Sequence, residues 1–339
     1  MKFLRMLCVQ LRQMLSWKLF VYGAVFALVQ TGGALGFMTR DEFTSVWYMR
    51  SGKTALTCAK ISLLQLFSNP NCILILAVMT IFSFYIYSPM CRISQFYQIS
   101  VPPWLFPFYL SWYQMLLVHC GLCLLLFADT VEIDSYTNLM LVRIGRVPYI
   151  LGYQLYILAA SFLYTVVQVL LSVLFILPVI GFDVDWGVLI RTLVDSAGQV
   201  AAQTNSTLSF VVSNEILSRF TPLKAMLVNF LCIWLSTAFV GFVICFFRIF
   251  LSKAAAVIVV GVLICLSLFV RFLGGMLIGT WLQYFSPLTW SNFAYLDWYY
   301  SGAAPSPAYA FTVWIGGIVL FGAASAIGFC KRDVRQTGR

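Results

Sequence analysis

The sequence is poor in charged residues. Of its 339 residues, 21 are Lys or Arg and 11 are Asp or Glu, together 9% of the chain. Soluble domains carry about 25% charged residues. The hydrophobic share, in contrast, is 62%. This balance leaves little room for a soluble domain, and the stretches between the most apolar segments are each too short to form an independent core.

Histidine is almost absent too, because His119 is the only one. A metal site built on two histidines within one chain is therefore excluded. The surrounding sequence, His119-Cys120-Gly121-Leu122-Cys123, has the wrong order for haem attachment, where the histidine follows the second cysteine. No second cysteine pair completes a four-ligand site. We expect buried thiols inside an apolar helix.

Charge is missing altogether from seven long stretches that fill most of the chain. They are residues 19–39, 61–91, 93–128, 147–182, 225–247, 254–270 and 298–330. Roughly 20 apolar residues suffice to cross a bilayer as a helix. The stretches do not alternate between apolar and polar residues, which disfavours barrel strands. Their lack of acids and lysines also argues against proton-coupled carriers, intramembrane aspartyl proteases and channels with charged filters.

The chain is therefore predicted to be an all-α polytopic membrane protein with six core transmembrane helices, and a seventh near the N-terminus if the first run also spans. Residues 1–18 are basic and amphipathic, which predicts a helix in the membrane interface. Residues 331–339 form a basic tail, which the positive-inside rule places in the cytoplasm. The predicted spans are 19–38, 71–89, 104–128, 149–180, 225–247, 254–270 and 309–330. Charge does not decide on which side the N-terminus lies.

Two further segments interrupt these runs. Ser51-Gly52-Lys53-Thr54 resembles the end of a phosphate-binding loop, but Trp47 stands where the leading glycine belongs. We expect a basic loop there and no nucleotide site. Residues 272–308 are rich in Trp, Tyr and Pro, which predicts a broken element at headgroup depth, re-entrant or lying on the surface, on the outer side.

A few amides lie at or near membrane depth. They are Gln30, Gln114, Gln154, Gln168 and Asn229. Such side chains either hydrogen-bond between helices or line a substrate path, and the sequence favours the first role.

The most informative polar segment is Asp129–Pro148, with the sequence DTVEIDSYTNLMLVRIGRVP. Its acids come first and its arginines last, which suits the dipole of a helix. The site residues predicted from this segment, all for coupling to a partner, are Asp129, Glu132, Asp134, Arg143 and Arg146. No catalytic, cofactor-binding or metal-binding residue is predicted.

This segment, the Arg143–Arg146 pair with the following Gly152, the stretch 285-FSPLTW and the tail 331-KRDV together resemble the permease subunits of type-two ATP-binding-cassette exporters. The similarity covers roughly residues 71–335. It implies a transport subunit of the plasma membrane with Asp129–Pro148 as its cytoplasmic coupling helix. It also implies two partners, a separate soluble ATPase and a second permease subunit, without a cofactor or nucleic acid. A membrane scaffold that transports nothing is the alternative, and a membrane enzyme is disfavoured.

Overall fold

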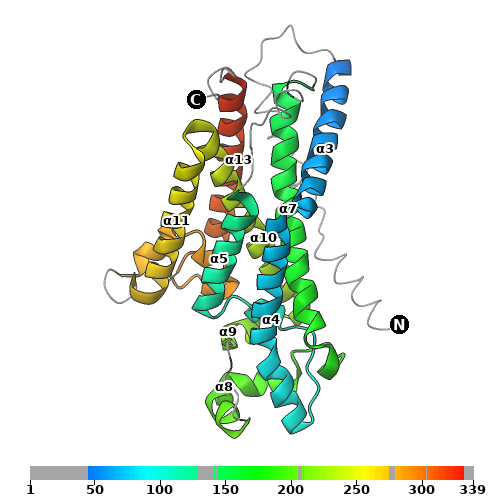
Figure 1. Ribbon diagram of the computed structural model, residues 1–339. Coiled ribbons are helices and arrows are strands. Elements are labelled where there is room, and N and C mark those ends of the chain that lie inside the picture. Colours follow the sequence, from blue (N-terminus) through cyan, green and yellow to red (C-terminus); the bar gives the residue numbers. More distant parts are fainter. Residues whose placement is uncertain are drawn as a thin grey trace.

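The computed structural model describes residues 45–128, 141, 144–204, 208, 210–274, 279–302 and 304–331. In these ranges the chain is a bundle of helices, and the only bridge between extended segments joins Val101 to Ile180. The longer helices run side by side between two ends, and α13 finishes at one of them (Figure 1). The α-helices are α3 (Ser45–Ser68), α4 (Pro70–Tyr97), α5 (Tyr113–Ala128), α7 (Arg146–Leu174), α8 (Gly187–Thr204), α9 (Asn214–Arg219), α10 (Pro222–Phe250), α11 (Lys253–Phe269) and α13 (Pro307–Lys331).

Five helices are long and apolar enough to cross a membrane: α4, α7, α10, α11 with its continuation to Phe272, and α13. They coincide with five of the six predicted core spans, and the prediction of an all-α polytopic membrane protein is confirmed. The predicted elements 1–18 and 19–38 and the tail beyond Lys331 lie outside the described residues.

The predicted span 104–128 is shorter as a helix than expected. The α-helix α5 begins only at Tyr113 and has 16 residues, about 24 Å at 1.5 Å per residue. Residues 101–112 precede it as an irregular, largely buried segment that holds the 3₁₀ turn η2 (Phe106–Phe108). Pro102, Pro103 and Pro107 lack a backbone N–H, which disfavours a continuous helix here.

Two prolines mark α4 in different ways. Pro70 follows the end of α3 and begins α4, whose N-cap Asn69 accepts a hydrogen bond from the Asn71 N–H at 3.0 Å. The predicted span 71–89 is too short at its C-terminal end, because Pro89 lies buried inside α4, which continues to Tyr97. A proline inside a membrane helix is tolerated where neighbouring helices restore part of the lost hydrogen bonding.

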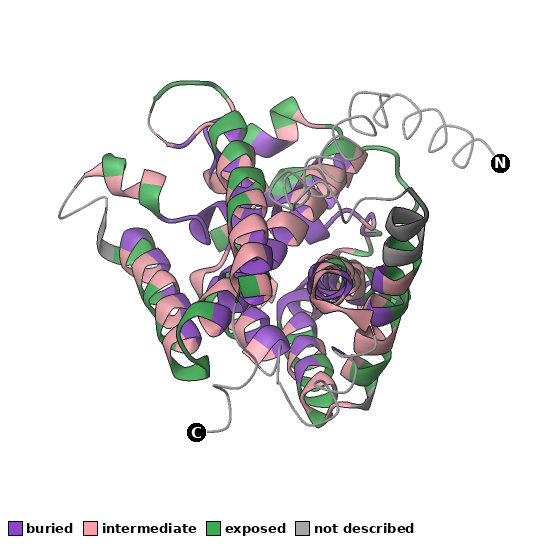
Figure 2. Cartoon of the chain, turned by 90° about the horizontal axis from the view of Figure 1, so that it is seen from above, coloured by how far each residue is buried: buried purple, intermediate pink, exposed green. Residues whose placement is uncertain are grey.

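The centre of the bundle is α10, the most buried of the five long helices, which packs against α5, α7, α11 and α13. Seen from above, buried positions face the interior of the bundle and exposed ones face outwards (Figure 2). At one point α3 and α7 nearly touch. A Cβ added at Gly152 would lie 2.6 Å from the Ala55 carbonyl oxygen and 2.7 Å from Cys58 Cβ. A small residue at Gly152 therefore permits the close approach.

Candidate functional site: the two ends of the bundle and its polar interior

One end of the bundle is formed where α5, α10 and α13 finish and α7 begins. Arg248, in the last turn of α10, donates from Nη1 to the carbonyl oxygen of Ala128, the last residue of α5, at 2.9 Å. The final carbonyls of a helix have no partner within it, and its C-terminus carries partial negative charge. The Arg248 guanidinium therefore stabilises the end of α5 and joins it to α10.

A second arginine does the same for α13. Arg146, the first residue of α7, donates from Nη1 to the carbonyl oxygen of Cys330 at 2.8 Å. Beside this contact the rings of Tyr149 and Phe329 stack with their centroids 5.7 Å apart. The residue before the predicted coupling segment and the arginine near its end are thus tied to α10 and to α13. We call this end, defined by Ala128, Arg146, Arg248 and Cys330, the arginine-locked end.

Four of the five predicted coupling residues, Asp129, Glu132, Asp134 and Arg143, lie outside the described residues. Arg146 is described, and it is half-buried with its contact to Cys330. The basic loop expected at Ser51–Thr54 is wrong, because these residues lie inside the helix α3. The Thr57 hydroxyl donates to the Lys53 carbonyl at 2.9 Å, an ordinary contact within a helix.

The stretch between α11 and α13 is a broken element, as predicted. Its described residues form a π-helical turn, η4 (Val270–Gly274), and three short 3₁₀ turns, η5 (Thr280–Phe285), η6 (Thr289–Ser291) and η7 (Phe293–Tyr295), and not a continuous span. The centre of this element is packed into the bundle, where Trp290 and Phe293 are buried.

Polar contacts hold this element inside the bundle. The Asn292 amide donates to the Leu110 carbonyl at 2.9 Å, and the Trp314 indole donates to the Pro287 carbonyl at 3.2 Å. The Ser286 hydroxyl donates to the Ser267 hydroxyl at 2.9 Å. Non-helical backbone is tolerated at membrane depth only where such partners exist.

Beyond these turns, Asp297 organises the return of the chain towards α13. Its carboxylate accepts hydrogen bonds from the Tyr299 N–H at 3.1 Å, the Ser301 hydroxyl at 3.1 Å and the Gly302 N–H at 2.7 Å. Burial opposes ionisation, but these hydrogen bonds outweigh it and hold the pKa of Asp297 below its usual value. Asp297 is therefore a structural anion.

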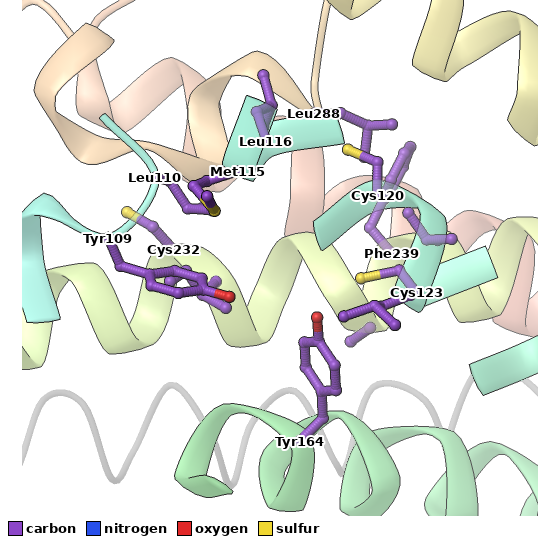
Figure 3. Packing of buried hydrophobic residues seen from close by; sticks show 14 of the residues in the cluster. Tyr109, Leu110, Met115, Leu116, Cys120, Cys123, Tyr164, Cys232, Phe239 and Leu288 are labelled. Atoms are coloured by element: carbon purple, nitrogen blue, oxygen red, sulfur yellow. The ribbon is translucent and has the colours of Figure 1, made fainter. Parts of the chain in front are cut away.

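The interior of the bundle holds a polar group centred on the only histidine. His119 on α5 is buried, with Nδ1 3.1 Å from the Tyr164 hydroxyl and 3.4 Å from the Gln168 amide nitrogen on α7. Cys123, one turn further along α5, lies 3.5 Å from the Thr237 hydroxyl on α10. The Tyr109 and Tyr164 side chains and the Cys123 sulfur point towards one another (Figure 3).

This group joins three helices but offers no metal centre. Among the residues that the structure describes, no group of three or more His, Cys, Asp or Glu side chains could hold a metal ion. The cysteines described here are free, so the thiols at Cys120 and Cys123 are packed side chains, as expected. The Cys123 sulfur also lies 3.7 Å from His119 Nε2. The contacts of this group with α7 and α10 are hydrogen bonds between helices.

Two of the amides singled out in the sequence act between segments. The Gln154 side chain donates to the Gly322 carbonyl on α13 at 2.7 Å, and Asn229 on α10 donates to the Phe106 carbonyl at 3.1 Å. Gln168 belongs to the His119 group, whereas the Gln114 amide donates to the hydroxyl of the neighbouring Tyr113 at 3.3 Å. The favoured role, hydrogen bonding between helices, is confirmed for Gln154. Gln30 lies outside the described residues.

Sequence reasoning missed the partners of these groups. Tyr164 and Gln168 are four residues apart on α7 and so share one face of the helix. A search for polar residues at that spacing in apolar runs could have found them. In comparisons with known proteins, no family model, no curated protein and no solved structure matches the chain.

Proposed function

We propose that this chain is the permease subunit of an ATP-binding-cassette exporter of the second type, located in the plasma membrane with its C-terminus in the cytoplasm. It forms the substrate path, and a separate ATPase drives it through the segment Asp129–Pro148. A second permease subunit, the same or related, completes the path.

One observation carries the proposal. Ala128, just before the charged segment, and Arg146, two residues before its end, are tied to the last turns of α10 and α13. The segment therefore starts and finishes at the arginine-locked end, from which the basic C-terminal tail also departs. Lys and Arg favour the cytoplasmic side, where a soluble ATPase would dock. The broken element between the last two long helices agrees with the same resemblance.

The described part of Asp129–Pro148 also refines which residues would meet the ATPase. Arg146 is committed to the Cys330 carbonyl, so it positions the segment and does not face a partner with that donor. The contact with the ATPase falls to the acids Asp129, Glu132 and Asp134 and to Arg143. Arg143 is therefore the sharper residue for a test.

The experiment compares the wild-type chain with Arg143→Glu, each co-expressed with the ATPase encoded beside its gene and reconstituted in lipid. We expect the ATPase to co-purify with the wild-type chain and to be lost, or uncoupled from transport, with Arg143→Glu. Arg191→Glu is the matched control, because Arg191 lies in α8, away from the arginine-locked end, and is 62% exposed. It should leave the ATPase bound.

Four outcomes would contradict the proposal. An ATPase that fails to co-purify with the wild-type chain would favour the scaffold alternative, as would a bound partner without transport. ATP turnover by the purified single chain, abolished by Lys53→Ala, would show that the chain hydrolyses nucleotide itself. Labelling of a cysteine placed at Ser135 from outside the cell, but not from inside, would overturn the orientation.

A further inference from the structure

Two arginines away from the arginine-locked end lie over tyrosine rings of the broken element. The Arg271 guanidinium carbon is 3.8 Å from the centroid of the Tyr295 ring, and that of Arg219 is 5.1 Å from the centroid of the Tyr299 ring. Tyr295 and Tyr299 are four residues apart, so a single short stretch supports both cations. These contacts are cation–π interactions.

Both arginines stand at the border of the apolar spans. Arg219 comes three residues before Pro222, where α10 begins, and Arg271 precedes Phe272, where the apolar span of α11 ends. Because α10 and α11 are consecutive, antiparallel and packed together, the start of one and the end of the other lie at the same end of the bundle. That depth is where a bilayer places its headgroups.

Among the residues that the structure describes, no carboxylate forms an ion pair with either guanidinium. In the described part of the chain the one ion pair is Arg191 with Asp185, at 3.5 Å. Asp297, which lies between the two tyrosines in sequence, directs its carboxylate to Tyr299, Ser301 and Gly302. A ring under a guanidinium occupies its flat face, whereas the N–H donors point outwards in its plane. Those donors match the oxygens of a phosphate.

The surroundings are aromatic and exposed. Five large side chains of this region are each more than half exposed, namely Phe272, Trp281, Phe285, Tyr299 and Tyr300. Aromatic residues of this kind concentrate at the membrane–water interface. Exposed rings beside two uncompensated arginines fit a lipid, which offers an acyl chain and an anionic headgroup together, better than they fit an acidic protein.

We infer that Arg219 and Arg271, supported by Tyr299 and Tyr295, each bind the phosphate of an anionic phospholipid in the leaflet at this end of the bundle. The site accounts for two basic residues that stand on the side where the positive-inside rule expects few. It does not depend on the permease proposal, since neither arginine belongs to the segment Asp129–Pro148.

The test uses the full-length chain in nanodiscs of phosphatidylcholine that contain a minor fraction of phosphatidylglycerol. Native mass spectrometry counts the phosphatidylglycerol molecules retained by each chain. We expect each of Arg219→Gln and Arg271→Gln to weaken lipid retention about fivefold, and the double variant to weaken it about 30-fold. The reason is that each basic residue near an anionic surface raises the affinity for it about fivefold. Arg191→Gln is the control and should retain lipid like the wild type.

Unfolding in pure phosphatidylcholine establishes that each variant is folded, and the single variants decide the question if the double variant fails to insert. A double Arg→Lys variant should fall between wild type and the glutamine variant, because lysine keeps the charge and loses the planar fork. Equal retention by the wild type and the glutamine variants would overturn the inference. So would equally tight binding of soluble glycerophosphate, or lipid retention unchanged while an acidic polypeptide binds only the wild type.

Discussion

Where α13 finishes, Arg146 and Arg248 direct guanidinium donors to the backbone carbonyls of Cys330 and Ala128. At the opposite end of α10 and α11, Arg271 and Arg219 rest on the faces of Tyr295 and Tyr299. The first pair is half-buried and the second pair is exposed. All four residues are arginines. A carbonyl oxygen accepts a hydrogen bond from a guanidinium N–H group, whereas a tyrosine ring under the guanidinium leaves the N–H groups able to donate to another partner. Counting basic residues at each end would miss this difference between a structural and a binding role.

The largest expected effect comes from breaking the arginine-locked end. Replacing Arg146 and Arg248 together by Met should lower the free energy of unfolding by about 3–6 kcal/mol, because a hydrogen bond to a charged group contributes about 1.5–3 kcal/mol. Denaturation of the lipid-reconstituted chain measures this. Arg191→Met should change it little, since the Arg191–Asp185 pair is exposed. A double variant as stable as the wild type would refute the structural role of this end.

Packing next to that end offers a matched pair of glycine substitutions. In Gly152→Ala the new Cβ would meet the Ala55 carbonyl oxygen at 2.6 Å, whereas at Gly261 in α11 a Cβ would meet nothing within 4 Å. We expect Gly152→Ala to destabilise the chain by about 1–3 kcal/mol through overpacking. Gly261→Ala should stabilise it by about 0.5–1 kcal/mol. The same sign for both variants in an unfolding assay would show that α3 does not pack on α7 in this way.

Substitutions at the opposite end of the bundle, where Tyr295 and Tyr299 lie under Arg271 and Arg219, should change the free energy of unfolding less. Tyr295→Leu removes the ring under Arg271 and should cost about 0.5–2 kcal/mol of unfolding free energy in neutral lipid. Tyr295→Phe keeps the ring and loses only the hydroxyl contact to the Ser111 carbonyl at 3.3 Å. Its effect should therefore be the smaller of the two. If Tyr295→Phe were as damaging as Tyr295→Leu, the hydroxyl and not the ring would support this end.

The smallest effect concerns pH. Because hydrogen bonds hold the pKa of Asp297 below its usual value, its contribution to stability is fully present above the usual carboxyl pKa of about 3.9. That contribution is lost as the pH falls through the lower pKa of the folded state. Between neutral and acidic pH, the free energy of unfolding should fall less steeply for Asp297→Asn than for the wild type. Identical pH profiles would mean that this carboxylate does not stabilise the turn.

The sequence predicted the long helices well and the short one badly. Runs such as 225–247 are apolar throughout, and α10 extends only a few residues beyond that run at each end. Hydropathy alone could not show that 104–112 stays irregular, because its residues are as apolar as those of a span. The irregular backbone of this segment depends on its proline content and on hydrogen bonds from two distant side chains, Asn229 and Asn292.

The functional residues were predicted less completely. Arg146 stood out because it ends a charged segment, but its partner is a backbone carbonyl of a residue 184 positions away, and no local pattern reveals that. The tyrosines under Arg219 and Arg271 belong to an aromatic stretch that was correctly predicted to be broken. Which ring meets which arginine follows from the tertiary packing of η7 and the residues after it.

The irregular segment before α5 also constrains how the chain is made. The Phe106 carbonyl has a local donor in the Tyr109 N–H at 3.1 Å, but the Leu110 carbonyl receives its donor from Asn292, 182 residues later. At a synthesis rate of about 5–20 residues per second, Asn292 emerges roughly 9–36 s after the carbonyl it serves. Until then the Leu110 carbonyl must be kept hydrated or sheltered by the insertion machinery, so the segment before α5 settles into the bundle after translation of the C-terminal half and not in the order of the sequence.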